Sequence, residues 1–202
     1  MRKLSWLVLA SVFLMLAGSL TTANAVPRGF VKHTEGNFVW FGPRSWGAAE
    51  GQNDIWISSP TGTQYLHYGA GGAACAYPPL YSDPAGFFSY LRSGYLNTAR
   101  ENFSLYSKGP RRARYTRVGR IQTINANYLR QRSTFTGIHR GKRIRGEMIL
   151  DFFAVGGGVC GNRQQVRAAP QRGFGRSIRQ LREVQKYIFG PKDATGTTPR
   201  ID

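Results

Sequence analysis

The residues in this sequence best suited to acid–base chemistry are its three histidines, His33, His67 and His139. A secreted ribonuclease or phosphodiesterase needs a general base and a general acid, and a cation to stabilise the charge that develops on phosphate. His67, His139, Glu147 and Arg145 are the candidates for these catalytic roles. No spacing links the histidines to one another, so a hydrolase is the alternative hypothesis and not the leading one.

The sequence contains no pattern that predicts a cofactor or a metal. Gly69–Ala74 fits the G-x-G-x-x-A pattern of a nucleotide-binding turn, but Cys75–Pro79 cannot begin the helix that would receive the pyrophosphate. The common zinc spacings of histidine and cysteine are absent, and so is the G-x-S-x-G turn of serine hydrolases. We therefore expect no metal and no cofactor.

The two cysteines, Cys75 and Cys160, predict a disulfide if the chain works in an oxidising compartment. Such a bond would close a loop of about 86 residues and would stabilise the fold by about 4.5 kcal/mol in the chain-entropy model. The alternative is that Cys160 acts as a nucleophile with His139. The disulfide is favoured because it leaves no thiol open to oxidation.

The N-terminus has the three parts of a secretory signal peptide. Arg2 and Lys3 precede an apolar run from Leu4 to about Gly18, and the small residues Ala23 and Ala25 follow. A membrane anchor is the alternative, which we disfavour because a spanning helix needs about 20 apolar residues. Cleavage after Ala25 would deliver a secreted or periplasmic chain. The predicted segments are the signal peptide 1–25, a loose segment 26–36, one α+β domain 37–190 and a disordered tail 191–202.

The positive charge is concentrated in the C-terminal half. The full chain carries a net charge of +18, yet residues 26–107 contain five basic and five acidic residues, whereas residues 108–145 contain twelve basic residues and no acid. This asymmetry favours an anionic polymer as partner, such as nucleic acid, an acidic glycan or an envelope phosphate, or else it is only a solvated face. The predicted anion-binding residues are Arg111, Arg112, Arg114, Arg117, Arg140, Lys142, Arg143 and Arg145.

The hydrophobic pattern predicts strands first, then a helix, then consecutive strands and a final helix. Early strands are expected at 38–41, 54–58 and 63–68, followed by a loop at 69–79, a helix from Asp83-Pro84 and a basic connector at 108–119. Later strands are expected at 120–129, 132–140, 143–155 and 159–167, with a closing helix at 174–189. The aromatic residues of the early strands are expected to form core: Trp40, Trp46, Trp56 and Tyr65.

This order predicts a single α+β domain, mainly an antiparallel sheet with an N-terminal hairpin and two covering helices, the last one C-terminal. With the run Ile57–Gly62 in the hairpin, the element order resembles that of the Mog1/PsbP-like α-β-α sandwich. The resemblance covers element order alone, and it favours a non-enzyme, because members of that fold mostly act by binding or assembling. The leading hypothesis is therefore a non-enzymatic envelope-associated protein that binds polyanions. A structural partner of another secreted protein is a third alternative.

Overall fold

The computed structural model of the chain describes residues 26–51, 53–74, 83–98, 110–156 and 159–190. Within these ranges the chain forms antiparallel sheets and two α-helices, as expected for an α+β fold. The strands are β1 (Phe30–Glu35), β2 (Phe38–Pro43), β3 (Gly47–Glu50), β4 (Asp54–Ser58), β5 (Tyr65–Ala74), β6 (Arg111–Asn125), β7 (Tyr128–His139), β8 (Lys142–Gly156), β9 (Val159–Pro170) and β10 (Ile188–Phe189), and the helices are α3 (Pro84–Thr98) and α4 (Phe174–Gln185).

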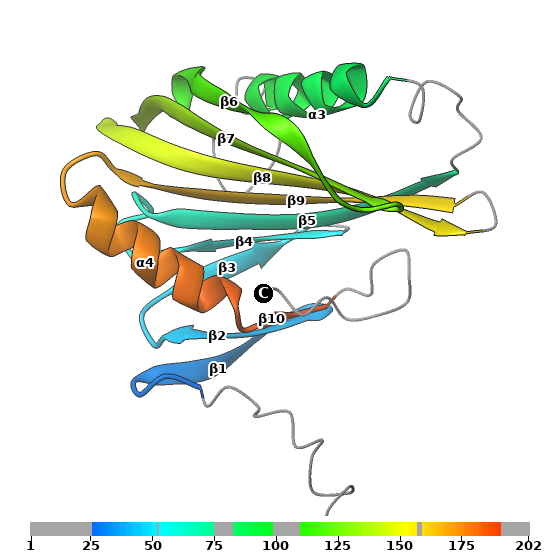
Figure 1. The fold of residues 1–202 in the computed structure, drawn as a ribbon. Helices are drawn as coiled ribbons and strands as arrows, with labels where there is room; N and C mark the ends of the chain where they lie inside the picture. The colour runs from blue at the N-terminus through cyan, green and yellow to red at the C-terminus, as the bar shows by residue number, and fades with distance from the viewer. Residues whose placement is uncertain (1–25, 52, 75–82, 99–109, 157–158, 191–202) are drawn as a thin grey trace, which may run out of the picture.

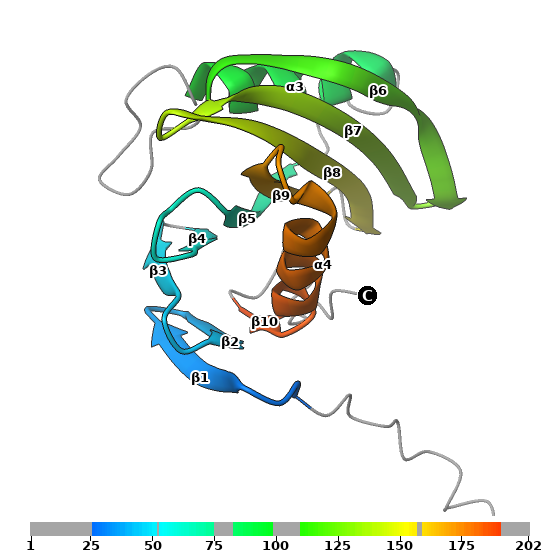
Figure 2. The same cartoon turned by 90° about the vertical axis from the view of Figure 1, so that its left-hand side faces the viewer.

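The strands form a large sheet and a small one. The large sheet has the order β3-β4-β5-β9-β8-β7-β6, and the small sheet has the order β1-β2-β10. The two sheets together curve around α4, which lies inside the curve, while α3 lies outside it beside β6 (Figures 1 and 2). We call the two sides of the large sheet the α4 face and the α3 face.

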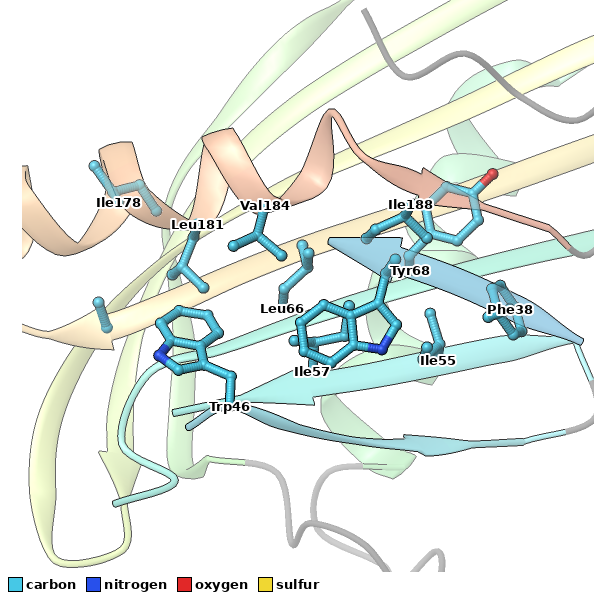
Figure 3. Close-up of a cluster of buried hydrophobic side chains, with 12 residues drawn as sticks. Phe38, Trp46, Ile55, Ile57, Leu66, Tyr68, Ile178, Leu181, Val184 and Ile188 are labelled. Carbon is cyan, nitrogen blue, oxygen red and sulfur yellow. The ribbon is translucent and has the colours of Figure 1, made fainter. Parts of the chain in front are cut away.

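The α4 face holds one of the two hydrophobic cores. Ile55 and Ile57 of β4 and Leu66 and Tyr68 of β5 pack against the buried side of α4, where Leu181 is fully buried (Figure 3). The alternation of buried and half-buried residues in β4 is the period of two expected of a strand with one face in a core. The other buried members of this cluster are Phe38, Trp40, Trp46, Ala169, Ile178, Val184 and Ile188.

The α3 face holds the second core. Phe88 and Tyr95 of α3 pack over a surface made mainly by β7, β8 and β9. The ring of Phe135 lies over Gly146, its cross-strand partner, where a Cβ atom would stand 2.1 Å from the ring. Glycine is therefore required at position 146 for the ring to lie flat on the sheet. The remaining buried members are Tyr65, Ile144, Met148, Leu150, Phe152, Cys160, Val166 and Ala168.

A two-residue turn fixes the register of the hairpin between β7 and β8. His139 pairs with Lys142, and the two residues between them have positive φ angles, 47° at Arg140 and 74° at Gly141. Two positive φ angles match the type I′ turn, whose twist suits an antiparallel hairpin. The next pairs along this register set Ile138 opposite Arg143 and Thr136 opposite Arg145.

The N-terminal half contains more strand than the sequence pattern predicted. The segment 26–36, expected to be loose, contains β1, which pairs with β2 along its whole length. The segment 69–74, expected to be a loop, continues β5 and pairs residue by residue with β9. Its glycines and alanines have low strand propensity, so the ladder with β9 determines its conformation and local preference does not.

The C-terminal half differs from the prediction in four places. The expected connector 108–119 is strand from Arg111 onward, and the turn after it lies at residues 126–127, where the prediction placed it near residue 130. Strand β9 continues to Pro170. The final helix ends at Gln185 because the chain then joins β2: Phe41 N donates to Tyr187 O at 3.0 Å, and Ile188 pairs with Trp40.

Two expectations lie outside the described residues, namely the signal peptide at 1–25 and the disordered tail at 191–202. In the parts of the chain that are described, no helix has the length and apolar character needed to cross a bilayer.

Replacing Leu181 by alanine tests the core between α4 and the sheet. Leu181 is 0% exposed, so Leu181→Ala should lower the free energy of unfolding by about 2–5 kcal/mol through lost burial and a residual cavity. Urea unfolding measures the change. Arg179→Ala, on the exposed side of the same helix, should change it by less than about 0.5 kcal/mol. Equal effects of the two substitutions would contradict the packing described.

Candidate anion-binding groove

Arginines recur in cross-strand rows on the α4 face of β6, β7, β8 and β9. Successive residues of a strand alternate between faces, so Arg145, Glu147 and Asp151 of β8 share the α4 face. The register aligns Glu147 with Thr134 of β7 on one side and with Arg167 of β9 on the other. Arg117 of β6 lies opposite Thr134, so each end of this row is an arginine.

The neighbouring cross-strand rows also carry arginines on the α4 face. Two residues along β8 toward its start, Arg145 lies opposite Thr136, which in turn lies opposite Arg114. Two residues beyond Glu147, Ile149 lies opposite Arg132. Every row from Arg145 to Ile149 therefore places at least one guanidinium on this face.

A groove of about 470 Å³ lies between this arginine-bearing surface and α4. This volume is within the range of small-ligand sites. Arg182 reaches the groove from α4, and every other lining residue belongs to β6, β7, β8 or β9. We call this the arginine groove; its lining residues are Arg117, Gly119, Arg120, Gln122, Arg132, Ser133, Thr134, Glu147, Met148, Ile149, Arg167 and Arg182.

Arg167 is the most buried cation of the groove, with 7% of its surface exposed. Burial lowers the pKa of its guanidinium to about 10; Glu147 opposes this shift, while Arg182 and Arg132 add to it. The side chain still carries its charge at neutral pH. Its Nε is buried and has no hydrogen-bond partner among the described residues, so part of its donor capacity is unused.

Glu147 connects the sheet to α4. Arg182 of the helix donates from Nη2 to Glu147 Oε1 at 2.6 Å, and Arg167 Nη2 lies 3.4 Å from Glu147 Oε2. One carboxylate thus lies among three arginines, Arg132, Arg167 and Arg182, and this part of the groove keeps an excess of positive charge. A protein site with more cations than carboxylates favours an anionic ligand.

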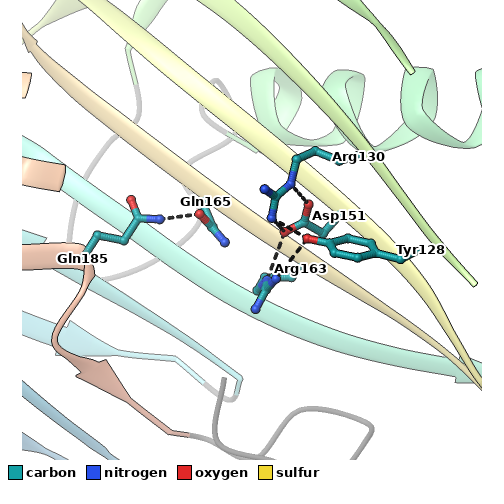
Figure 4. Close-up of polar contacts among 6 residues, drawn as sticks. All are labelled: Tyr128, Arg130, Asp151, Arg163, Gln165 and Gln185. Carbon is teal, nitrogen blue, oxygen red and sulfur yellow. Dashed lines mark hydrogen bonds and ion pairs between the residues drawn. The ribbon is translucent and has the colours of Figure 1, made fainter. Parts of the chain in front are cut away.

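A second charged cluster lies beyond the groove on the same face (Figure 4). Asp151 is fully buried and accepts from Arg130 Nε at 2.6 Å and from Arg163 Nε at 3.0 Å. Both arginines also donate to the hydroxyl of Tyr128. The hydrogen bond to Asp151 raises the pKa of Arg130. Asp151 therefore holds two arginines in fixed positions on the sheet.

The structure does not bring the four catalytic candidates together. His67 lies opposite Val166, and Val166 lies opposite Met148, so the imidazole is on the α3 face. His139 lies opposite Lys142 and shares the α3 face, where its ring packs 4.9 Å from that of Tyr65. Glu147 and Arg145 are on the α4 face, and the sheet separates them from both histidines.

His67 and His139 each have a local partner. His67 Nε2 is 2.9 Å from Asp54 Oδ2, and the His67 ring is stacked on Trp56 at 4.1 Å. Burial alone would raise the pKa of Asp54, but the hydrogen bond and charge of His67, with the hydrogen bond from Trp56, produce a net lowering. His139 Nε2 lies 3.0 Å from the carbonyl oxygen of Gly62. These contacts hold strands and turns in place.

The predicted anion-binding residues are all exposed but do not form one patch. Arg117 lines the groove, and the register places four others on the same face: Arg111, Arg114, Arg143 and Arg145. Lys142 pairs with His139 on the opposite face, Arg140 occupies the hairpin turn, and Arg112 has a φ of 52° beside a bulge.

Sequence reasoning missed four arginines of the groove: Arg120, Arg132, Arg167 and Arg182. Arg167 lies opposite Glu147 across β8 and β9, and Arg182 reaches the same carboxylate from α4. The alternation of arginines along the strands was a sequence signal for the position of Arg167 opposite Glu147. The contact of Arg182 with Glu147 could not be predicted from strand periodicity, because Arg182 lies on α4.

Cys160 of β9 is 1% exposed, and the described part of the chain contains no free cysteine. Its predicted partner Cys75 lies outside the described residues, so their pairing stays a prediction. In the ladder of β5 with β9, Cys160 lies opposite Ala73, two residues before Cys75.

No protein-family model matches this chain, and no curated protein matches it. Among solved structures, the chain is similar to the crystal structure of LpqN, which is described as involved in cell envelope biogenesis of Mycobacterium tuberculosis. The alignment covers 79% of this chain and 87% of that chain, with 10% sequence identity and a TM-score of 0.39. We infer neither a fold family nor a function from a likeness at this level.

Replacing Asp151 tests its role as anchor for two arginines. Asp151→Asn would leave the charges of Arg130 and Arg163 close together without a carboxylate, and should lower the free energy of unfolding by about 3 kcal/mol. Glu183→Gln, in an exposed ion pair with Lys186, should cost less than about 0.5 kcal/mol. Denaturant unfolding of both variants measures the difference, and an Asp151→Asn chain as stable as the Glu183→Gln chain would refute this role.

The lowered pKa of Asp54 predicts a pH dependence of stability. The folded-state pKa lies below the ordinary value of 3.8, so the contribution of the Asp54–His67 pair is present above about pH 4 and is lost as the pH falls through the folded pKa. Asp54→Asn should therefore lower the urea midpoint at pH 7, and the gap from the unaltered chain should narrow below pH 4. A gap that widens on acidification would contradict this sign.

Proposed function

We propose that this chain is an extracytoplasmic binding protein that holds an anionic polymer on the α4 face of its large sheet. The observation that carries the proposal is the arginine groove, in which Arg117, Arg132, Arg167 and Arg182 converge from three strands and a helix on one hollow. A surface of exposed arginines alone would be an ordinary solvated face. A groove that contains a buried guanidinium is a more demanding arrangement, because burying a charge costs free energy unless an opposite charge compensates it.

A hydrolase that uses His67 or His139 with Glu147 finds less support. The imidazoles and the carboxylate lie on opposite faces of the sheet, and a general acid or base must reach the reacting group within about 3 Å. His67 and His139 are buried at 8% and 3% exposure, which also keeps a polymeric substrate from them. Binding is the function that the described residues favour.

The compartment and the fold family are further parts of the proposal. Export by the N-terminal segment and a bond between Cys75 and Cys160 fit a protein that acts in the periplasm or outside the cell. The Mog1/PsbP-like sandwich is proposed on element order alone. Binding to an envelope polymer would follow from this location.

Heparin binding at several salt concentrations tests the polyanion site. The unaltered chain should bind heparin with an affinity that falls steeply with salt, because each arginine contact releases condensed counterions. The double variant Arg117→Gln, Arg132→Gln should bind more weakly and reduce the slope of log K against log salt by about two.

The control for net charge is the double variant Arg28→Gln, Arg172→Gln, which removes two exposed arginines that do not line the groove. This control variant should keep nearly the full slope of log K against log salt. Equal losses in the two double variants would show that only the net charge matters, and an unaltered chain that ignores heparin at low salt would refute the proposal.

A further inference from the structure

The groove contains a feature that a simple polyanion site does not need. Glu147 places a carboxylate on the floor, between Arg167 and Arg182. A carboxylate repels the phosphate, sulfate or carboxylate groups of an anionic polymer. Its two ion pairs use two of about four acceptor positions, and 21% of its side chain is exposed. Glu147 therefore keeps acceptor capacity at the groove surface for a hydrogen-bond donor.

Two donor groups next to Glu147 remain available to an anion. Arg167 is more than nine-tenths buried, its Nε has no hydrogen-bond partner among the described residues, and its contact to Glu147 is long at 3.4 Å. Arg132 lines the groove, and no ion pair is recorded for it within the described residues. A ligand group at this point would meet two guanidinium groups and one carboxylate together.

The lining lacks the groups that read nucleic acid bases. Among the described residues that line the groove, none is aromatic, although single-stranded nucleic acid sites depend on stacking of bases on aromatic rings. Thr134 and Gln122 supply a hydroxyl and an amide to the same surface, and these groups pair well with hydroxyls. A polymer rich in hydroxyls fits this lining better than one rich in planar bases.

We propose that the ligand of the arginine groove is an acidic glycan, whose anionic group binds Arg132 and Arg167 while a neighbouring hydroxyl donates a hydrogen bond to Glu147. This inference rests on the proposed function and narrows it to one class of polymer. Glu147 acts as a selectivity residue: it weakens the binding of polymers that carry only anionic oxygens and favours those that also carry donors. Specificity of this kind combines a favourable contact with a repulsive one.

The test compares three probes that each carry six negative charges on the purified chain: hexagalacturonate, cyclic hexaphosphate and a single-stranded DNA with six phosphates. Glu147→Gln removes the repulsion between Glu147 and every probe, but it also removes from the glycan a charge-assisted hydrogen bond that hexaphosphate, which has no donor group, does not make. The ratio of the dissociation constants, hexagalacturonate over hexaphosphate, should therefore rise by about tenfold. Glu183→Gln makes the same charge change at an exposed ion pair outside the groove and should leave the ratio unchanged.

A loss of folding in Glu147→Gln would be detected by circular dichroism. Glu147→Asp then replaces it, since it keeps the charge but withdraws the acceptor by one methylene; the ratio should again rise. An unchanged ratio in the folded variant overturns the assignment to a glycan, and so does tighter binding of DNA than of hexagalacturonate by the unaltered chain. In both cases binding of the probes keeps the proposed function intact, whereas failure of all three probes to bind at low salt overturns the proposed function itself.

Discussion

The antiparallel pairing of β8 with both of its neighbours is the constraint on which the two faces of this protein depend. β8 pairs with β7 from Lys142 to Phe153 and with β9 from Ile144 to Gly156. A slip of one residue would move every side chain of β8 to the other face of the sheet. Met148 and Leu150 would then leave the core under α3, and Glu147 would leave the arginines. The hydrophobic core and the charged groove are therefore fixed by the same register.

The register also explains how one sheet supports two chemically different surfaces. The α3 face of β8 carries Ile144, Met148 and Leu150 in a core, and the α4 face carries Arg145, Glu147 and Asp151. α4 covers the α4 face over β4 and β5, where the buried sheet residues are apolar, and over β9, where Ala169 is apolar but Gln165 hydrogen-bonds to Gln185 of the helix. The groove forms at the margin of the helix, where the apolar contact ends and the arginines begin.

The sequence was informative where hydrophobic alternation is regular and misleading where pairing overrides composition. Strand β4 lies where its alternation predicted, and Asp83 caps α3 as expected, accepting from Gly86 N at 2.8 Å. The run 69–74 was predicted to be a loop because of its glycines, yet the ladder with β9 makes it strand. The bulges of β6 could not be predicted either, because nothing in residues 111–125 shows where a register shift will occur.

The positive charge of the candidate site could be expected from the sequence, but the residues that line it could not. The predicted basic stretch lies on β6, β7 and β8, and Arg117 from it lines the groove. Arg167 and Arg182 come from segments that are distant from that stretch in sequence, and only the fold brings them to Glu147. The same fold separates the histidines from Glu147, which residue types alone had grouped with them as catalytic candidates.

The spacing of the arginine rows has a consequence for how a long polymer would be held. Rows that start at Arg143, Arg145 and Glu147 recur every two residues along β8, which is about 7 Å in an extended strand. Because the rows of Arg143 and Arg145 each carry two arginines and no acid, a flexible chain can bind them in alignments that differ by one repeat. The number of such alignments grows with polymer length and adds a statistical, purely entropic share to the binding free energy. The surface would therefore distinguish long chains from short ones even when every individual contact is the same.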